Sequence, residues 1–114
     1  MNYVETRPWG TFTILLDSPI CKVKIITIKP GESPSYQYHF KREEHWVIVK
    51  GSGVLLLNNE RSSVKEGENV FIAKEDKHTI INNGKEDLIF IETQLGEYFG
   101  EDDIVRLDDK YGRI

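Results

Sequence analysis

Apolar residues recur along the chain in short runs, and residues that favour turns separate these runs. Between residues 21 and 28, Lys22 and Lys24 alternate with Val23 and Ile25, which is the period-two pattern of a half-buried β-strand. Further short strand-like segments, most of them apolar, occupy residues 11–16, 45–50, 54–57, 61–64, 69–72, 78–81 and 88–93. They recur at a spacing of roughly 8 to 12 residues, and no stretch of about 15 residues has a helical period. The pattern therefore predicts an all-β fold, a small antiparallel sandwich or barrel.

Turn-forming residues mark the ends of most of the predicted strands. Pro30 and Gly31 end the strand at 21–28, and Asn58 and Asn59 lie between the runs at 54–57 and 61–64. Such short connections are typical of β-hairpins. Residues 96–114 are acidic with a few arginines, and their periodicity predicts no element.

The composition limits the classes of function. A chain of 114 residues forms one domain, which we assign to residues 1–114. The net charge of −4 and the absence of a basic stripe argue against nucleic acid as a partner. No apolar run approaches the ~20 residues of a membrane helix, and the N-terminal residues lack the features of a secretory signal. We therefore expect a cytoplasmic protein that does not bind membranes.

Four polar residues have the spacing of a metal site. Gln37 and His39 are two residues apart, so in an extended strand both side chains leave the same face. Glu44 follows at the start of an apolar strand, and His78 begins another one. A shell of one amide oxygen, two imidazoles and one carboxylate suits a divalent zinc, manganese, iron, cobalt or nickel ion. His45 points away from Glu44 in a strand, so we predict a core or ligand-supporting role for it.

These residues resemble the two conserved motifs of the cupin superfamily. The first motif is matched by Gly31, Gln37, His39, Glu44 and Gly51. The second is matched by Gly67, Ala73, His78 and Asn82, with Ala73 where the superfamily usually has proline. The resemblance implies a small β-barrel, the double-stranded β-helix or jelly-roll-like fold, in which the first motif supplies three metal ligands.

Nearly the whole chain is similar to one branch of the superfamily, the phosphomannose isomerase domain of bacterial type II enzymes. The similarity rests on glutamine at position 37 and on three further segments, residues 7–10, 42–46 and 98–113. Members of this branch commonly have consecutive histidines where this chain has Phe40 and Lys41. In the family the domain usually follows a mannose-1-phosphate guanylyltransferase domain.

The resemblance implies a metal-dependent isomerase that interconverts mannose 6-phosphate and fructose 6-phosphate by proton transfer through an enediol. Such a reaction needs a base and cations that hold the phosphate. We predict that Arg42 and Arg106 bind the phosphate, with Lys41 and Arg113 as further substrate-binding residues. Glu97 and Glu92 are the candidate bases, and Glu97 is our first choice.

A second interpretation remains open from the sequence. A cupin without a guanylyltransferase domain could be a sugar-phosphate-binding or regulatory subunit that keeps the metal but has no turnover. A carboxylate next to the metal ligands would favour the enzyme, and a dry, aromatic-filled barrel would favour the binding protein. By resemblance to other small cupins we expect a homodimer.

Overall fold

The computed structural model describes residues 3–108, which form eleven β-strands and no helix. The strands are β1 (Val4–Arg7), β2 (Gly10–Asp17), β3 (Cys21–Ile28), β4 (Tyr36–Tyr38), β5 (Arg42–Lys50), β6 (Ser52–Leu57), β7 (Glu60–Lys65), β8 (Asn69–Ile72), β9 (His78–Ile81), β10 (Leu88–Gly96) and β11 (Val105–Asp108). The predicted all-β fold is confirmed. Because these residues contain no helix, none of them forms a helix that could cross a membrane.

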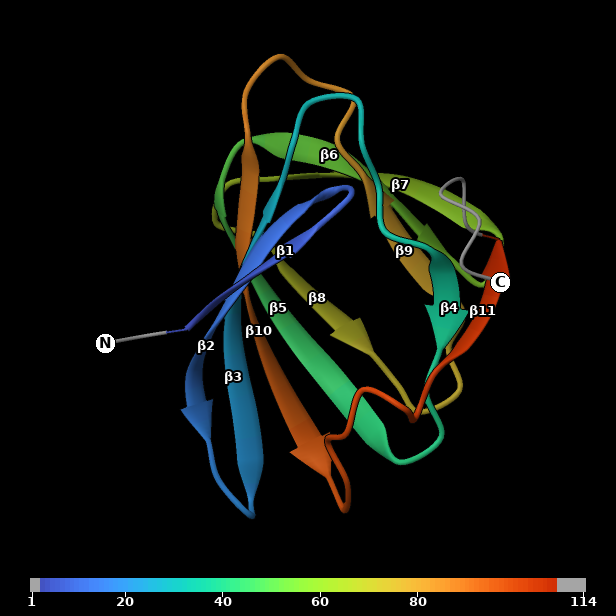
Figure 1. The fold of residues 1–114 in the computed structure, drawn as a ribbon. Coiled ribbons are helices and arrows are strands. Elements are labelled where there is room, and N and C mark those ends of the chain that lie inside the picture. Colours follow the sequence, from blue (N-terminus) through green and yellow to red (C-terminus); the bar gives the residue numbers. More distant parts are fainter. Residues whose placement is uncertain (1–2, 109–114) are drawn as a thin grey trace.

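The strands form two antiparallel sheets that face each other and enclose the interior of the molecule (Figure 1). The six-stranded sheet has the order β1-β2-β3-β10-β5-β8, and the five-stranded sheet has the order β11-β4-β9-β6-β7. Strands that are neighbours in a sheet are often distant in sequence, as with β10 between β3 and β5. This arrangement brings the N-terminal and C-terminal halves of the chain around one interior.

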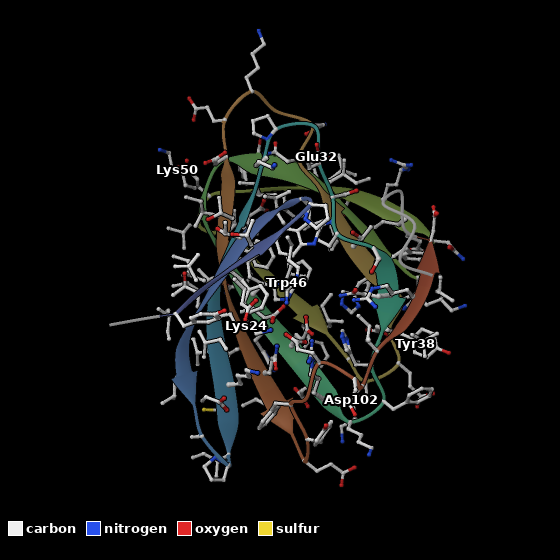
Figure 2. The ribbon with its side chains drawn as sticks, viewed as in Figure 1. Lys24, Glu32, Tyr38, Trp46, Lys50 and Asp102 are labelled. Atoms are coloured by element: carbon white, nitrogen blue, oxygen red, sulfur yellow. The ribbon has the colours of Figure 1, made fainter. Side chains whose placement is uncertain are left out.

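The hydrophobic core fills one part of this interior. Its buried residues are Trp9, Phe12, Ile26, Ile28, Trp46, Ile48, Leu55, Val64, Val70, Ile72, Ile80, Leu88 and Phe90. Trp46 packs against Phe90 with their ring centroids 4.6 Å apart. The side chains of Trp46 and Lys24 both lie in the space between the sheets (Figure 2).

The other part of the interior is polar, which is unusual for the inner face of an antiparallel sheet. The inward side chains there come from neighbouring strands of the six-stranded sheet, and they are Lys22, Lys24, Arg42, Glu44, Glu92 and Gln94. In β3 the lysines therefore point inward, whereas Val23 and Ile25 point outward and are only partly buried. The alternation predicted a half-buried strand, and the structure shows that its polar side faces the interior.

Turns and the C-terminal segment complete the fold. Asn58 and Asn59 have φ values of 48° and 69°, the left-handed pair that a two-residue hairpin between β6 and β7 requires.

After β10, the chain returns to the barrel, where the Asp103 carboxylate accepts hydrogen bonds from the backbone N–H groups of Phe40 and Lys41. β11 then pairs with β4. Arg113 lies outside the described residues.

Candidate functional site

Three of the predicted metal ligands converge in the polar part of the interior. His39 follows β4, Glu44 lies in β5 and His78 begins β9. The Glu44 carboxylate lies 3.6 Å from His39 Nδ1 and 3.7 Å from His78 Nε2. All three side chains are buried, and one potential ligand atom from each lies within 4.8 Å of the others. The elements that carry them come from both sheets, so the fold itself assembles the cluster.

The hydrogen bonds of His78 leave one nitrogen available as a ligand. His78 Nδ1 lies 2.8 Å from the carbonyl oxygen of Asp76, which can only accept, so Nδ1 carries the hydrogen. In the neutral ring Nε2 then carries a free lone pair, and it is buried without a hydrogen-bond partner next to Glu44. An unpaired buried nitrogen costs free energy, whereas a metal ion would use its lone pair. The cluster therefore fits a divalent metal ion.

The hydrogen bonds of His39 differ from those of His78. Its Nε2 lies 2.9 Å from Nη2 of Arg42, and because a guanidinium only donates, Nε2 accepts this hydrogen bond. The hydrogen of the neutral ring then lies on Nδ1, the atom that faces Glu44. Ligation by His39 requires either the other tautomer or a turned ring, and both break the contact with Arg42.

Gln37 lies beside the cluster. It pairs with His78 across β4 and β9. Its side chain, with those of Glu44 and His78, lines a pocket between the two sheets. Its Oε1 accepts a hydrogen bond of 2.6 Å from Ser35 Oγ. The amide is thus held at the edge of the site by a neighbouring hydroxyl.

Neighbouring charges set the protonation of the cluster. Complete burial alone would raise the pKa of Glu44, but His78, Arg42 and His39 outweigh burial and hold that pKa well below its usual range. Trp46 Nε1 and Arg42 Nε donate hydrogen bonds of 3.0 Å to the same carboxylate. Burial lowers the pKa of His39 to about 4. Glu44 is therefore ionised and His39 neutral at neutral pH, as metal ligation requires.

A second buried carboxylate, Glu92 of β10, lines the same pocket. Burial and the neighbouring Glu44 charge raise the pKa of Glu92 to about 8. Gln94 Nε2 donates a hydrogen bond of 2.7 Å to Glu92 Oε2 and fixes its position. Glu97, our first choice of base, is exposed and is not among the residues that line the pocket.

The predicted phosphate-binding residues lie in different environments. Arg106 lines the pocket, and its Nε is buried without a hydrogen-bond partner. Arg42 is buried and pairs with Glu44. Lys41 is exposed, with its ammonium group 5.2 Å from the Tyr98 ring centroid. Of these three, only Arg106 lines the pocket.

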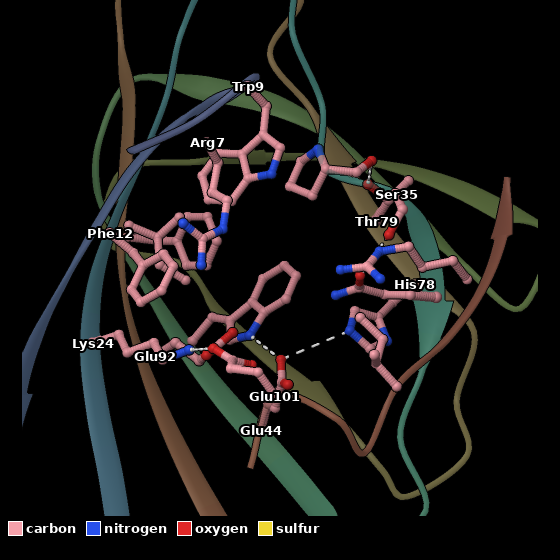
Figure 3. A pocket seen from close by; sticks show the side chains of 17 residues that line it. Arg7, Trp9, Phe12, Lys24, Ser35, Glu44, His78, Thr79, Glu92 and Glu101 are labelled. Carbon is pink, nitrogen blue, oxygen red and sulfur yellow. Dashed lines mark hydrogen bonds and ion pairs between the residues drawn. The ribbon is translucent and has the colours of Figure 1, made fainter. Parts of the chain in front are cut away.

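Two of the charged residues that line the pocket, Lys24 and Glu101, were not predicted. Lys24 lines the pocket from β3, and Glu101 reaches it from the segment after β10 (Figure 3). The strict alternation of Lys22 and Lys24 was the available signal, but alternation does not reveal which face is buried. The predicted supporting role of His45 is wrong, because its side chain is exposed, contacts Glu43 at 2.7 Å and lies against the Phe71 ring.

Two facing antiparallel sheets with a His-Glu-His cluster between them define a double-stranded β-helix of the cupin class. Solved structures with a similar fold include capsular polysaccharide assembling protein CapF from Staphylococcus aureus. That match has a TM-score of 0.82, 24% identity and coverage of 95% of this chain and 33% of CapF. A double-stranded β-helix protein from Klebsiella pneumoniae matches with a TM-score of 0.75, 18% identity and coverage of 86% and 83%. These likenesses show the fold.

Sequence comparison places the chain within this class. The model of the family "Mannose-6-phosphate isomerase C-terminal" matches residues 2–109, and the chain belongs to that family. A mannose-1-phosphate guanylyltransferase of Salmonella montevideo is 46% identical over 107 residues, which are 94% of this chain and 23% of the relative. The chain thus spans about a quarter of the length of such relatives.

Proposed function

We propose that the protein is a metal-dependent isomerase that interconverts mannose 6-phosphate and fructose 6-phosphate. The observation that carries this proposal is that Glu44 and His78, which cluster with His39, line the same pocket as the Glu92 carboxylate. Membership of the mannose-6-phosphate isomerase C-terminal family supports the choice of substrate. A carboxylate beside the ligand cluster also favours an enzyme over a non-catalytic sugar-phosphate-binding subunit.

The bound ion would be held by His39, Glu44 and His78, with the amide oxygen of Gln37 as a fourth ligand. It would supply Lewis-acid polarisation of the substrate carbonyl. The pocket holds three arginine or lysine residues and an aromatic wall that excludes water, formed by Trp9, Phe12, Trp46 and Phe90.

Glu92 is the base in this proposal. Because its pKa is raised to about 8, Glu92 is a stronger base than an ordinary carboxylate, and its ionised fraction removes the proton from C2 of the aldose phosphate and returns it to C1. The proton of the C2 hydroxyl passes to the C1 oxygen in the same interconversion. Gln94 holds the carboxylate in place through its hydrogen bond. Arg106 offers a buried Nε without a partner, which suits a phosphate or hydroxyl oxygen of the substrate.

We also propose that the protein forms a homodimer through the outer face of the six-stranded sheet. Val47, Val49 and Phe71 are 45%, 47% and 53% exposed there. Six strands of four to nine residues give a face of roughly 700 Å² from strand spacing and rise, close to the ~800 Å² per partner of a stable interface.

The test is a coupled assay of mannose 6-phosphate turnover by the full chain, with and without added divalent metal. We expect metal-dependent turnover, and Glu92→Gln should lower kcat by about 10²- to 10⁴-fold. Glu97→Gln, which changes an exposed carboxylate five residues later in the chain, just after β10, is the matched control and should retain activity. Folded, metal-loaded protein without turnover would reject the isomerase.

A further inference from the structure

Two buried cations from different strands contact one carboxylate, and one of the two, Lys24, lines the pocket. Lys24 of β3 and Arg42 of β5 each have side chains about 95% buried, with exposures of 5% and 4%. Burial of a charge is costly unless an anion pairs with it. Arg42 is only partly satisfied, because its Nη1 atom is buried without a hydrogen-bond partner.

The anion between these cations comes from a distant segment. Glu101, in the loop between β10 and β11, places Oε1 2.5 Å from Lys24 Nζ and Oε2 3.8 Å from Arg42 Nη1. Its side chain remains 51% exposed, so it reaches inward from the solvent side. The distance to Nη1 exceeds that of a hydrogen bond, and the carboxylate therefore leaves one donor of the pair unused.

The loop is held in place by other contacts. Asp103 accepts hydrogen bonds from the backbone of Phe40 and Lys41, and Tyr98 donates to Asp102. Glu101 could consequently turn out toward solvent without unfolding the loop. Its departure would leave Lys24 Nζ and Arg42 Nη1, the two atoms that its oxygens now contact, as a pair of donors for another anion.

We propose that Lys24 and Arg42 form a phosphate-binding subsite, and that the Glu101 carboxylate occupies it until the phosphate of the substrate displaces it. A phosphate dianion offers more charge and more acceptor oxygens than one carboxylate, and it can reach both donors at once. The naming of a sugar phosphate rests on the proposed function, whereas the subsite rests on the two buried cations. Glu101 is thus a competing internal ligand as well as a partner of Lys24.

Calorimetric titration of the full chain with inorganic phosphate and, separately, with mannose 6-phosphate tests this proposal. Removal of the competing charge in Glu101→Gln should tighten binding of both by about tenfold. If the Glu101–Lys24 ion pair is merely structural, Glu101→Gln should lower the stability of the protein and leave phosphate binding unchanged or weaker. Because improved binding cannot arise from misfolding, this variant remains decisive if others fold poorly.

Lys24→Met, which keeps most of the aliphatic stem, should weaken binding of both ligands by at least about tenfold. Glu97→Gln and Lys50→Met change exposed residues that do not line the pocket and serve as the matched controls for Glu101→Gln and Lys24→Met. Wild-type affinity in Lys24→Met, or no gain in Glu101→Gln, would overturn the subsite.

The two proposals fail in different ways. If the variants change phosphate affinity as expected but no isomerisation occurs, the subsite stands and the isomerase is rejected. If isomerisation occurs and Lys24→Met has the KM of the wild type, the isomerase stands and the subsite is rejected. Binding of inorganic phosphate alone, with no mannose 6-phosphate bound, would overturn the assignment to substrate.

Discussion

The most informative single atom of the site is Nε2 of His78. It is buried, carries no hydrogen and has no hydrogen-bond partner, although Glu44 lies 3.7 Å away. Leaving a polar atom in this state costs about 1–3 kcal/mol. A ligated metal ion would remove that cost and would also balance the ionised Glu44.

His78→Ala should therefore lose most of the bound metal while the protein remains folded, because the remaining donors make an incomplete shell. Elemental analysis of the purified protein measures the metal, and circular dichroism measures the fold. His45→Ala is the matched control, since His45 is exposed and lies outside the cluster. Equal metal content in wild type and His78→Ala would show that the site is misassigned.

The sequence predicts which residues lie on the same side of a strand more readily than it predicts which side is buried. Gln37 and His39 were grouped by their two-residue spacing, and the two histidines and Glu44 do meet in the structure. His45 was correctly placed opposite Glu44, but the opposite side is solvent. Spacing fixes relative orientation, whereas burial depends on the neighbouring strands.

At the level of elements, tight turns place the strands that carry the site. Gly51, between β5 and β6, and Gly67, before β8, have the same left-handed φ of +84°. A Cβ at Gly51 would lie 2.7 Å from the Asp87 carbonyl oxygen, whereas a Cβ at Gly67 would meet nothing within 4 Å. The first turn is thus restricted by packing as well as by backbone conformation.

Gly51→Ala should destabilise the protein by about 1–3 kcal/mol more than Gly67→Ala. Both substitutions carry the similar cost of alanine in a left-handed conformation, so their difference reports the close approach to Asp87. Urea unfolding followed by tryptophan fluorescence gives the two free energies of unfolding. Equal losses of unfolding free energy in the two variants would mean that the backbone at Asp87 shifts to accommodate the new Cβ without cost.

Elements with many local signals were predictable, and elements defined by distant partners were not. The Asn58-Asn59 turn was recognised because both residues accept positive φ. β11 was not predicted, because it has four residues and is defined by its pairing with β4, about seventy residues earlier in the chain. The contact of Glu101 with Lys24 depends on the same long-range pairing, which explains why the sequence did not indicate it.

At the scale of the whole molecule, the six-stranded sheet has an unusual distribution of polarity. Its inner face carries charged residues at the pocket, and its outer face carries Val23, Ile25, Val47, Val49 and Phe71. An antiparallel sheet that faces water normally shows the reverse alternation. An apolar face of this size is typical of a contact surface.

The proposed homodimer predicts that a charge on this face separates the subunits. Val47→Lys places an ammonium group in the middle of β5, where a facing sheet would have to desolvate it. The variant should therefore sediment as a monomer at micromolar concentrations, whereas the wild type should sediment as a dimer. Leu107→Lys is the matched control, because Leu107 is 42% exposed, close to the 45% of Val47, but lies in the other sheet. The control should remain dimeric with an unchanged circular dichroism spectrum. A monomeric wild type, or a Val47→Lys variant that stays dimeric, would exclude this face as the interface between two copies.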